Sequence, residues 1–140
     1  MRVLALASIA SGLALGVLSQ TAPPARADEP HVVLVVFDGV IDEVSPQGAA
    51  MKAWCDTRNT RLLVVLWPFL QGLGRGRYYP FEKLHGLVEA ECQRLEIPFH
   101  DVLPALRDTP SEELWVTPAD MHANPTAHRL ALPGIVNFVR

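Results

Sequence analysis

The sequence lacks any cluster of basic residues, any internal repeat and any low-complexity tract. It has 12 Lys and Arg residues against 15 Asp and Glu, a net charge of −3. Recognition of nucleic acid depends on concentrated positive charge, so we expect no nucleic-acid partner. Beyond the N-terminal segment there is also no apolar run long enough to cross a bilayer.

One long apolar run is present, at the N-terminus. Arg2 precedes the apolar residues 3–17, and the small-residue site Ala25-Arg26-Ala27 follows. This order predicts that residues 1–27 are a secretory signal peptide; the alternative is an uncleaved anchor. We therefore expect an exported protein, periplasmic or secreted, without stable membrane insertion after cleavage. Residues 28–140 would form one small domain with ten basic and fifteen acidic residues, a net charge of −5.

Cysteine is scarce, since Cys55 and Cys92 are the only two in the chain. After export both would enter an oxidising compartment, where one disulfide can form. The alternative is two buried thiols that pack as small apolar groups. Composition alone leaves both alternatives open.

Hydrophobic patterning predicts strands that alternate with helices. Apolar, β-branched runs predict two buried strands, at residues 31–37 and 61–67, and residues 97–102 predict a short third strand. Capping residues and prolines predict three helices, which begin at Ser45, Pro80 and Asn124. The last helix should be interrupted at Pro133-Gly134, because proline removes a donor and clashes with the preceding turn.

This alternation indicates an α/β fold, a small three-layer parallel sheet with flanking helices. If the strands lie side by side in chain order, both crossover helices cover the same face. Cys55 and Cys92 would then lie on neighbouring helices, which favours the disulfide. Ligands of such sheets bind at the carboxyl edge of the strands. That edge should hold Asp101 and the segment Asp120–His122.

Glycines and arginines alternate in the connection from Phe69 to Tyr79, where Gly72 is followed by Gly74-Arg75-Gly76-Arg77. Such a segment can cradle a phosphate, but the P-loop order and its Lys-Ser/Thr ending are missing. We interpret it as a mobile surface loop.

The candidate catalytic stretch is Asp120-Met121-His122, which Asn124-Pro125 follows as the start of a helix. A base held by an acid is half of a hydrolytic site. A metal site that also uses His128 is the alternative, but this spacing matches no zinc motif, and we expect no metal and no cofactor. His100 beside Asp101 is interpreted as a pair at the end of a strand.

The segment Leu114–Asn124 (LWVTPADMHAN), with Ala127–Leu130 after it, resembles the last sequence block of SGNH (GDSL-type) hydrolases. These are esterases and lipases with a flavodoxin-like three-layer fold. Three upstream segments match the usual path to that block: residues 63–68, 79–81 and 97–101. The similarity covers roughly residues 61–132. More loosely, His31–Asp42 resembles the family strand that ends in Gly-x-Asn-Asp.

The resemblance implies that His122 is a general base and that Asp120 orients it and stabilises the imidazolium. The spacing here is Asp-x-His, whereas Asp-x-x-His is commoner in the family. The family's Gly-Asp-Ser block is absent, and Val40-Ile41 stands where its oxyanion Asn is expected. The chain therefore resembles only the C-terminal part of the family, a fold truncated at its N-terminal side. The serines weighed as nucleophiles are Ser8, Ser45 and Ser111.

Two hypotheses of function follow. In the first, the protein is an SGNH-like ester or acyl hydrolase of small ester or acylated substrates, such as acylated carbohydrates, with a nucleophile that is cryptic or lies outside this chain. In the second, it is a non-catalytic exported remnant or a binding module on the same half-fold. The missing serine block favours the second hypothesis, a protein without catalytic activity. The residue matches favour descent from a hydrolase, as in the first hypothesis.

Overall fold

The structure is a computed structural model that describes residues 3–6, 32–37 and 44–140, with side chains from residue 48 onward. Its strands are β1 (Val3–Leu6), β2 (Val32–Phe37), β3 (Arg61–Leu66), β4 (Phe99–Asp101), β5 (Trp115–Thr117) and β6 (Asp120–Ala123). Its helical elements are α1 (Val44–Asp56), α2 (Glu82–Arg94), α3 (Leu103–Leu106), the 3₁₀ turn η2 (Ser111–Glu113) and α4 (Pro125–Val139). Strands and helices alternate as predicted, and the α/β class is confirmed.

The first four strands form one parallel sheet in the order β1-β2-β3-β4. Val35 of β2 pairs with Val64 of β3, and Leu66 of β3 pairs with Asp101 of β4. Because all four strands run in one direction, their carboxyl ends meet at one edge of the sheet. The remaining two strands form a separate antiparallel hairpin, β5-β6.

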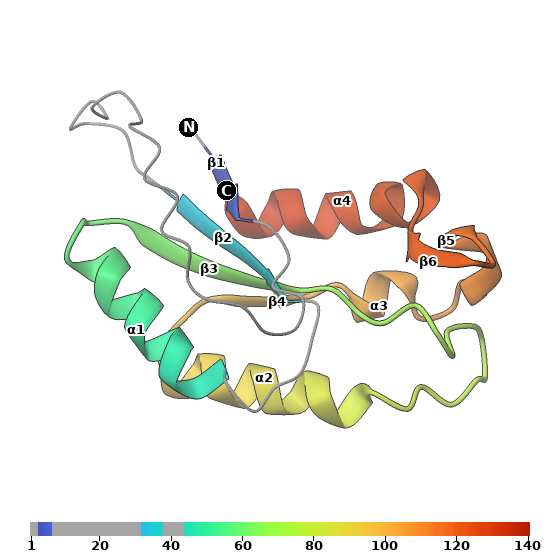
Figure 1. The fold of residues 1–140 in the computed structure, drawn as a ribbon, viewed down its shortest axis with the longest axis horizontal. Coiled ribbons are helices and arrows are strands. Elements are labelled where there is room, and N and C mark those ends of the chain that lie inside the picture. The colour runs from blue at the N-terminus through green and yellow to red at the C-terminus, as the bar shows by residue number, and fades with distance from the viewer. Residues whose placement is uncertain (1–2, 7–31, 38–43) are drawn as a thin grey trace.

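Strand β3 is buried on both faces, since residues 62–66 are all buried. Alternate side chains point to opposite faces of a sheet. Leu62, Val64 and Leu66 accordingly pack with α1 and α2, whereas Val65 packs with α3 and α4. Figure 1 shows the resulting three layers, with α1 and α2 on one side of the sheet and α4 on the other. The prediction that both crossover helices cover the same face is confirmed.

Cys55 of α1 and Cys92 of α2 belong to the cluster on the α1–α2 face. Both are free thiols, 2% and 3% exposed. The disulfide that the predicted helix arrangement favoured is therefore absent, and the thiols pack as small apolar groups. Burial raises the pKa of both, that of Cys92 to about 11, so little thiolate is present at neutral pH.

We expect both thiols to react slowly with a disulfide reagent in the native protein and rapidly after unfolding, because the thiolate is the reactive form. Thiol titration with and without denaturant measures this. A reductant should leave the melting temperature unchanged. An unfolded protein that yields no titratable thiol until it is reduced would contradict the prediction.

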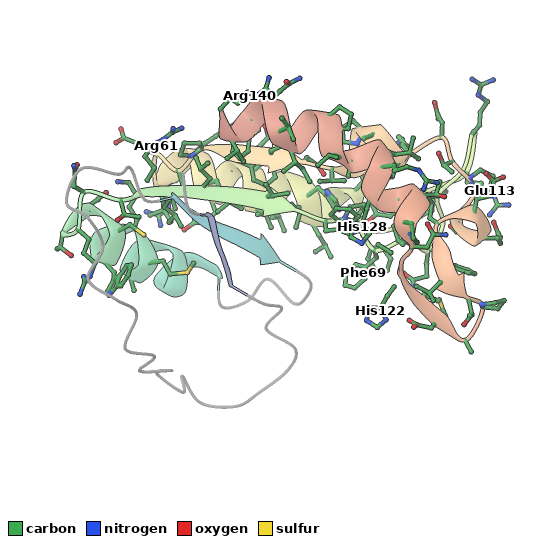
Figure 2. The ribbon with its side chains drawn as sticks, turned by 90° about the horizontal axis from the view of Figure 1, so that it is seen from above. Arg61, Phe69, Glu113, His122, His128 and Arg140 are labelled. Carbon is green, nitrogen blue, oxygen red and sulfur yellow. The ribbon has the colours of Figure 1, made fainter. Side chains whose placement is uncertain are left out.

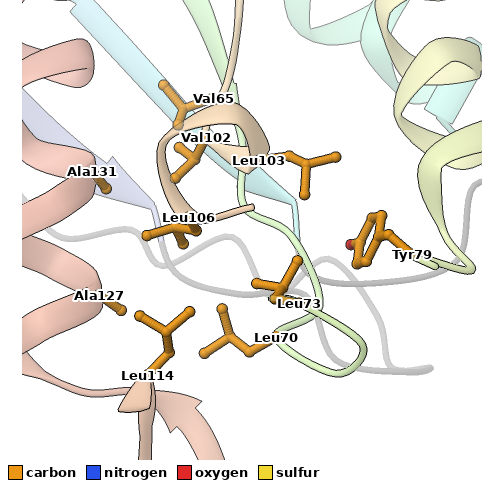
Figure 3. Close-up of a cluster of buried hydrophobic side chains, with 10 residues drawn as sticks. All are labelled: Val65, Leu70, Leu73, Tyr79, Val102, Leu103, Leu106, Leu114, Ala127 and Ala131. Atoms are coloured by element: carbon orange, nitrogen blue, oxygen red, sulfur yellow. The ribbon is translucent and has the colours of Figure 1, made fainter. Parts of the chain in front are cut away.

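The cluster on the opposite face joins distant parts of the chain (Figure 3). The connection between β3 and α2 contributes Leu70, Leu73 and Tyr79, which are 4%, 1% and 2% exposed. Helix α4 contributes Ala127 and Ala131, both buried. This connection is therefore part of the core.

The glycine-rich connection is anchored to the core at Leu73, whereas residues 75–78 are exposed, as predicted for a surface loop. Its positive backbone φ angles, 80° at Gly72 and 132° at Gly74, need glycine and turn the chain so that Leu73 enters the core. Buried Ser111 holds the loop from the other side. Its Oγ accepts a hydrogen bond from the Leu73 N–H at 3.0 Å and donates to the Leu73 carbonyl at 3.3 Å.

Ser111→Ala should destabilise the protein by about 1–3 kcal/mol, because it leaves two buried backbone groups of Leu73 without partners. Thr60→Val is the control, since it removes a hydroxyl whose hydrogen bond is exposed, and it should change stability by less than about 0.5 kcal/mol. Urea denaturation of both variants measures the difference. Equal effects would show that Ser111 does not anchor the loop.

Helix α4 begins at Asn124 as predicted, but it is not interrupted at Pro133-Gly134. It continues through Pro133 to Val139. Pro133 is exposed, so the backbone carbonyl that loses its helical donor can bind water. Packing of the opposite side against the sheet keeps the helix intact, since tertiary contacts provide most of the stability of a helix in a protein.

Gly134 brings α4 close to β4. An ideal Cβ at Gly134 would lie 2.8 Å from Nε2 of His100, whose ring stacks on Phe138 at 5.4 Å. Contacts of this length require a shift, so Gly134→Ala should destabilise the protein by about 1–3 kcal/mol.

Gly86→Ala is the matched control, because this glycine lies in α2 with nothing within 4 Å of its Cβ position. It should stabilise the protein by about 0.5–1 kcal/mol. Thermal unfolding of both variants measures the contrast, and stabilisation by both would contradict the close approach at Gly134.

The predicted signal peptide, residues 1–27, is described only at residues 3–6, which form β1. The rest of it lies outside the described residues, as do Val40 and Ile41. Export and cleavage remain predictions. Among residues 3–6, 32–37 and 44–140, no helix has the length and apolar character needed to cross a membrane.

Candidate functional site

Asp120 and His122 both lie on β6, two residues apart. Side chains at positions i and i+2 of a strand point to the same face. The Asp-x-His spacing therefore brings the carboxylate and the imidazole together on one face of β6. The imidazole Nδ1 lies 2.5 Å from Asp120 Oδ1. With Nδ1–H donating to the carboxylate, Nε2 carries the lone pair. The His122 side chain is 84% exposed.

The Asp120 carboxylate is fixed by local hydrogen bonds. Oδ1 of Asp120 also accepts a hydrogen bond from the backbone N–H of His122 at 3.2 Å. The backbone N–H of Asp120 donates to Thr117 Oγ1 at 3.0 Å. Hydrogen bonds from the His122 side chain and backbone hold the pKa of Asp120 below its usual value. The carboxylate is thus ionised at neutral pH. Its contribution to stability is present above an ordinary Asp pKa of about 4 and is lost as the pH falls through the lowered value.

The hairpin packs against the chain that leaves the carboxyl end of β3. Gln71 Nε2 donates to the Met121 sulfur of the hairpin at 3.2 Å. Beside it, α4 contacts the same part of the chain, since the rings of Trp67 and His128 lie 5.2 Å apart. Figure 2 shows His122, His128 and the partly exposed ring of Phe69 at the same end of the molecule. The Asp–His pair therefore lies at the sheet edge where ligands of α/β proteins bind.

The structure limits the choice of a nucleophile. Ser111 is 2% exposed and its hydroxyl is hydrogen-bonded to Leu73, so it is not presented to a substrate. Ser45 is the second residue of α1, and its side chain lies outside the described residues. Ser8 also lies outside the described residues, two positions after the end of β1.

No metal centre is formed by the part of the chain that the structure describes, where no group of three or more His, Cys, Asp or Glu side chains could hold an ion. His128, the third residue of the alternative metal site, packs its ring against Trp67.

A second Asp–His pair was missed in the sequence. Asp101 was paired with its neighbour His100, but adjacent strand residues point to opposite faces, and His100 stacks on Phe138 instead. Both carboxylate oxygens of Asp101 lie 2.9 Å from Nδ1 of His85 in α2. The sequence signal that points to His85 is its helical spacing with Val88 and Cys92. These three residues form the buried face of α2.

The second pair continues to a tyrosine. Nε2 of His85 lies 3.2 Å from the hydroxyl of Tyr79, and Asp101 Oδ1 accepts the N–H of Leu103 at 2.8 Å. Burial raises the pKa of Tyr79 above its usual value, an effect that a hydrogen bond with the Phe69 backbone opposes. The phenol is neutral and buried, so this chain of contacts ties the loop to β4 and α3 and offers no accessible nucleophile.

Comparison with models of known protein families, with curated proteins and with solved structures found no match. The geometry at the sheet edge and the sequence motif are the two observations that bear on function. Both concern the same two residues, Asp120 and His122.

Proposed function

We propose that the protein is an SGNH-like ester or acyl hydrolase in which His122 is the general base and Asp120 orients it. The observation that carries the proposal is the Asp120–His122 hydrogen bond, which fixes Nδ1 while the imidazole remains 84% exposed. A base must reach the proton that it removes, and an imidazole that is 84% exposed can be approached by a substrate at the hairpin.

The proposed chemistry is acyl transfer through a serine. Nε2 of His122 takes the serine proton as Oγ attacks the ester carbonyl, and the imidazolium is stabilised by the Asp120 carboxylate. The proton then passes to the leaving alcohol as the C–O bond breaks. Water hydrolyses the acyl-enzyme by the same route, and the acid is released. Small esters and acylated carbohydrates are the proposed substrates.

The sheet supports an SGNH-like assignment. Flavodoxin-like sheets have the strand order 2-1-3-4-5. The order found here, four parallel strands in chain order, is what remains of that arrangement when its edge strand 2 is absent. In this alignment β1 and β2 correspond to strands 1 and 3. The described strands then lack a counterpart of strand 2, which is internal in the chain order, rather than of the N-terminal strand that a fold truncated at its N-terminal side would lack.

In the sequence, Ser8 stands two positions after Leu6, the last residue of β1. This order resembles the family's first strand followed by its serine, and it makes Ser8 the proposed nucleophile. Cleavage after residue 27 would remove Ser8. The second candidate function, a non-catalytic binding module, applies to such a cleaved chain.

Hydrolysis of p-nitrophenyl acetate by the full-length chain tests the proposal. His122→Ala should lower kcat/KM by about 10²- to 10⁴-fold, the usual contribution of a general base, and Asp120→Asn should act in the same direction. Asp108→Asn is the control, because Asp108 is an exposed carboxylate outside the hairpin, and it should retain activity. Turnover that His122→Ala leaves unchanged would refute the catalytic role.

Ser8→Ala tests the nucleophile, with Ser45→Ala as its matched control. Only the first should abolish turnover and block covalent labelling by a fluorophosphonate. The intact mass of the exported protein shows in parallel whether residues 1–27 are retained. Activity in a chain that begins at residue 28 would exclude Ser8.

A further inference from the structure

We propose that Asn124 is a positioning residue for the Asp120–His122 pair, because its carboxamide closes the base of the β5–β6 hairpin. Asn124 directly follows β6 and stands two residues after His122. The kinetic part of this inference rests on the proposed function. The geometric part, that Asn124 holds the imidazole at its carboxylate, does not.

One side of the carboxamide caps α4. Its Oδ1 accepts the N–H groups of Thr126 at 2.8 Å and Ala127 at 3.1 Å. These are two of the donors that a helix leaves unsatisfied at its start. This is the capping role that the sequence predicts for Asn124, and Ser or Asp would fulfil it equally well.

The other side clamps the hairpin. Nδ2 donates to the carbonyl oxygens of Glu113 and Trp115, each at 2.9 Å, and the backbone N–H of Asn124 donates to the Leu114 carbonyl at 2.8 Å. Leu114 is completely buried, so the clamp ties the end of β6 to a fixed point in the core. Only a side chain with an N–H₂ group can make both side-chain bonds, which excludes Ser and Asp from this role.

The hairpin needs such a clamp. It is paired at Trp115–Ala123 and Thr117–Asp120, with an irregularity between them. Two-stranded hairpins of this size are marginal in water, and residues 116–122 are all exposed. The orientation of His122 therefore depends on how the base of the hairpin is held.

Two substitutions separate the clamp from the cap. Asn124→Ser and Asn124→Asp each keep an oxygen that can cap α4, and each removes the donors to Glu113 and Trp115. Asn124→Asp also brings a negative charge to those two carbonyls. Both variants should keep the helical circular dichroism of the native protein and lose the fixed hairpin. Asn137→Asp is the matched control, because Asn137 is an exposed residue of the same helix.

The decisive readout is the NMR resonance of the His122 Nδ1 proton, assigned by its loss in Asp120→Asn. This resonance should be present in the native protein and in the control variant Asn137→Asp, which keeps Asn124. It should be lost or broadened by exchange in both Asn124 variants. In the hydrolase assay the Asn124 variants should lower kcat by about 10- to 100-fold, as expected for a displaced catalytic group, with a smaller change in KM. A native protein without turnover would refute the proposed function and leave the NMR test valid.

A measurement on the native protein covers the case in which a variant fails to fold. Both Nδ2 protons of Asn124 are engaged, so they should exchange with solvent more slowly than those of Asn137. Exchange as fast as that of Asn137 would overturn the proposal. So would an unchanged His122 resonance in folded Asn124→Ser and Asn124→Asp.

Discussion

The burial of β3 on both faces is the constraint on which the rest of the structure depends. Five successive apolar residues, 62–66, can all leave water only if each face of the sheet is covered. Crossover helices α1 and α2 cover one face, and α3 and α4 cover the other. The chain that leaves β3 must then run along the carboxyl edge, where Trp67 and Gln71 contact the start of α4 and the hairpin. The position of the candidate site thus follows from the way in which one strand is buried.

Sequence patterns predicted the structural features that depend on neighbouring residues. They did not predict the features that depend on contacts between residues far apart in the chain. The three predicted strands, the cap of α4 at Asn124 and the shared face of α1 and α2 follow from local periodicity, capping and chain order. Three features do not. Pro133 stays within a helix because α4 packs against the sheet, the glycine-rich loop is anchored by a serine 38 residues from Leu73, and Asp101 pairs with a histidine 16 residues away. In each case the responsible partner is far away in the chain, and no local rule identifies it.

The two Asp–His pairs show that environment, rather than residue type, determines what such a pair can do. His122 and Asp120 are two residues apart, and the imidazole is 84% exposed. His85 and Asp101 join a helix to a strand, and the imidazole is 8% exposed and in contact with a buried phenol. A proton acceptor for catalysis must be reached by its substrate, which only His122 can be. The buried pair instead satisfies polar groups that the core would otherwise leave unpaired.

Residues 3–8 have incompatible roles in the proposal that Ser8 is the nucleophile and in the prediction of a cleaved signal peptide. In the hydrolase, β1 pairs with β2 over four residues and leads to Ser8. In the exported form, cleavage removes both. The loss has a structural consequence as well as a chemical one, because β2 would then be an edge strand with unpaired N–H and C=O groups, and such an edge is open to pairing with another chain. Removal of the leader would thus take away the proposed nucleophile and create a surface to which an extended segment can bind. Retention of residues 1–27 would decide the hydrolase proposal only if Ser8, rather than Ser45 or a group outside this chain, is the nucleophile.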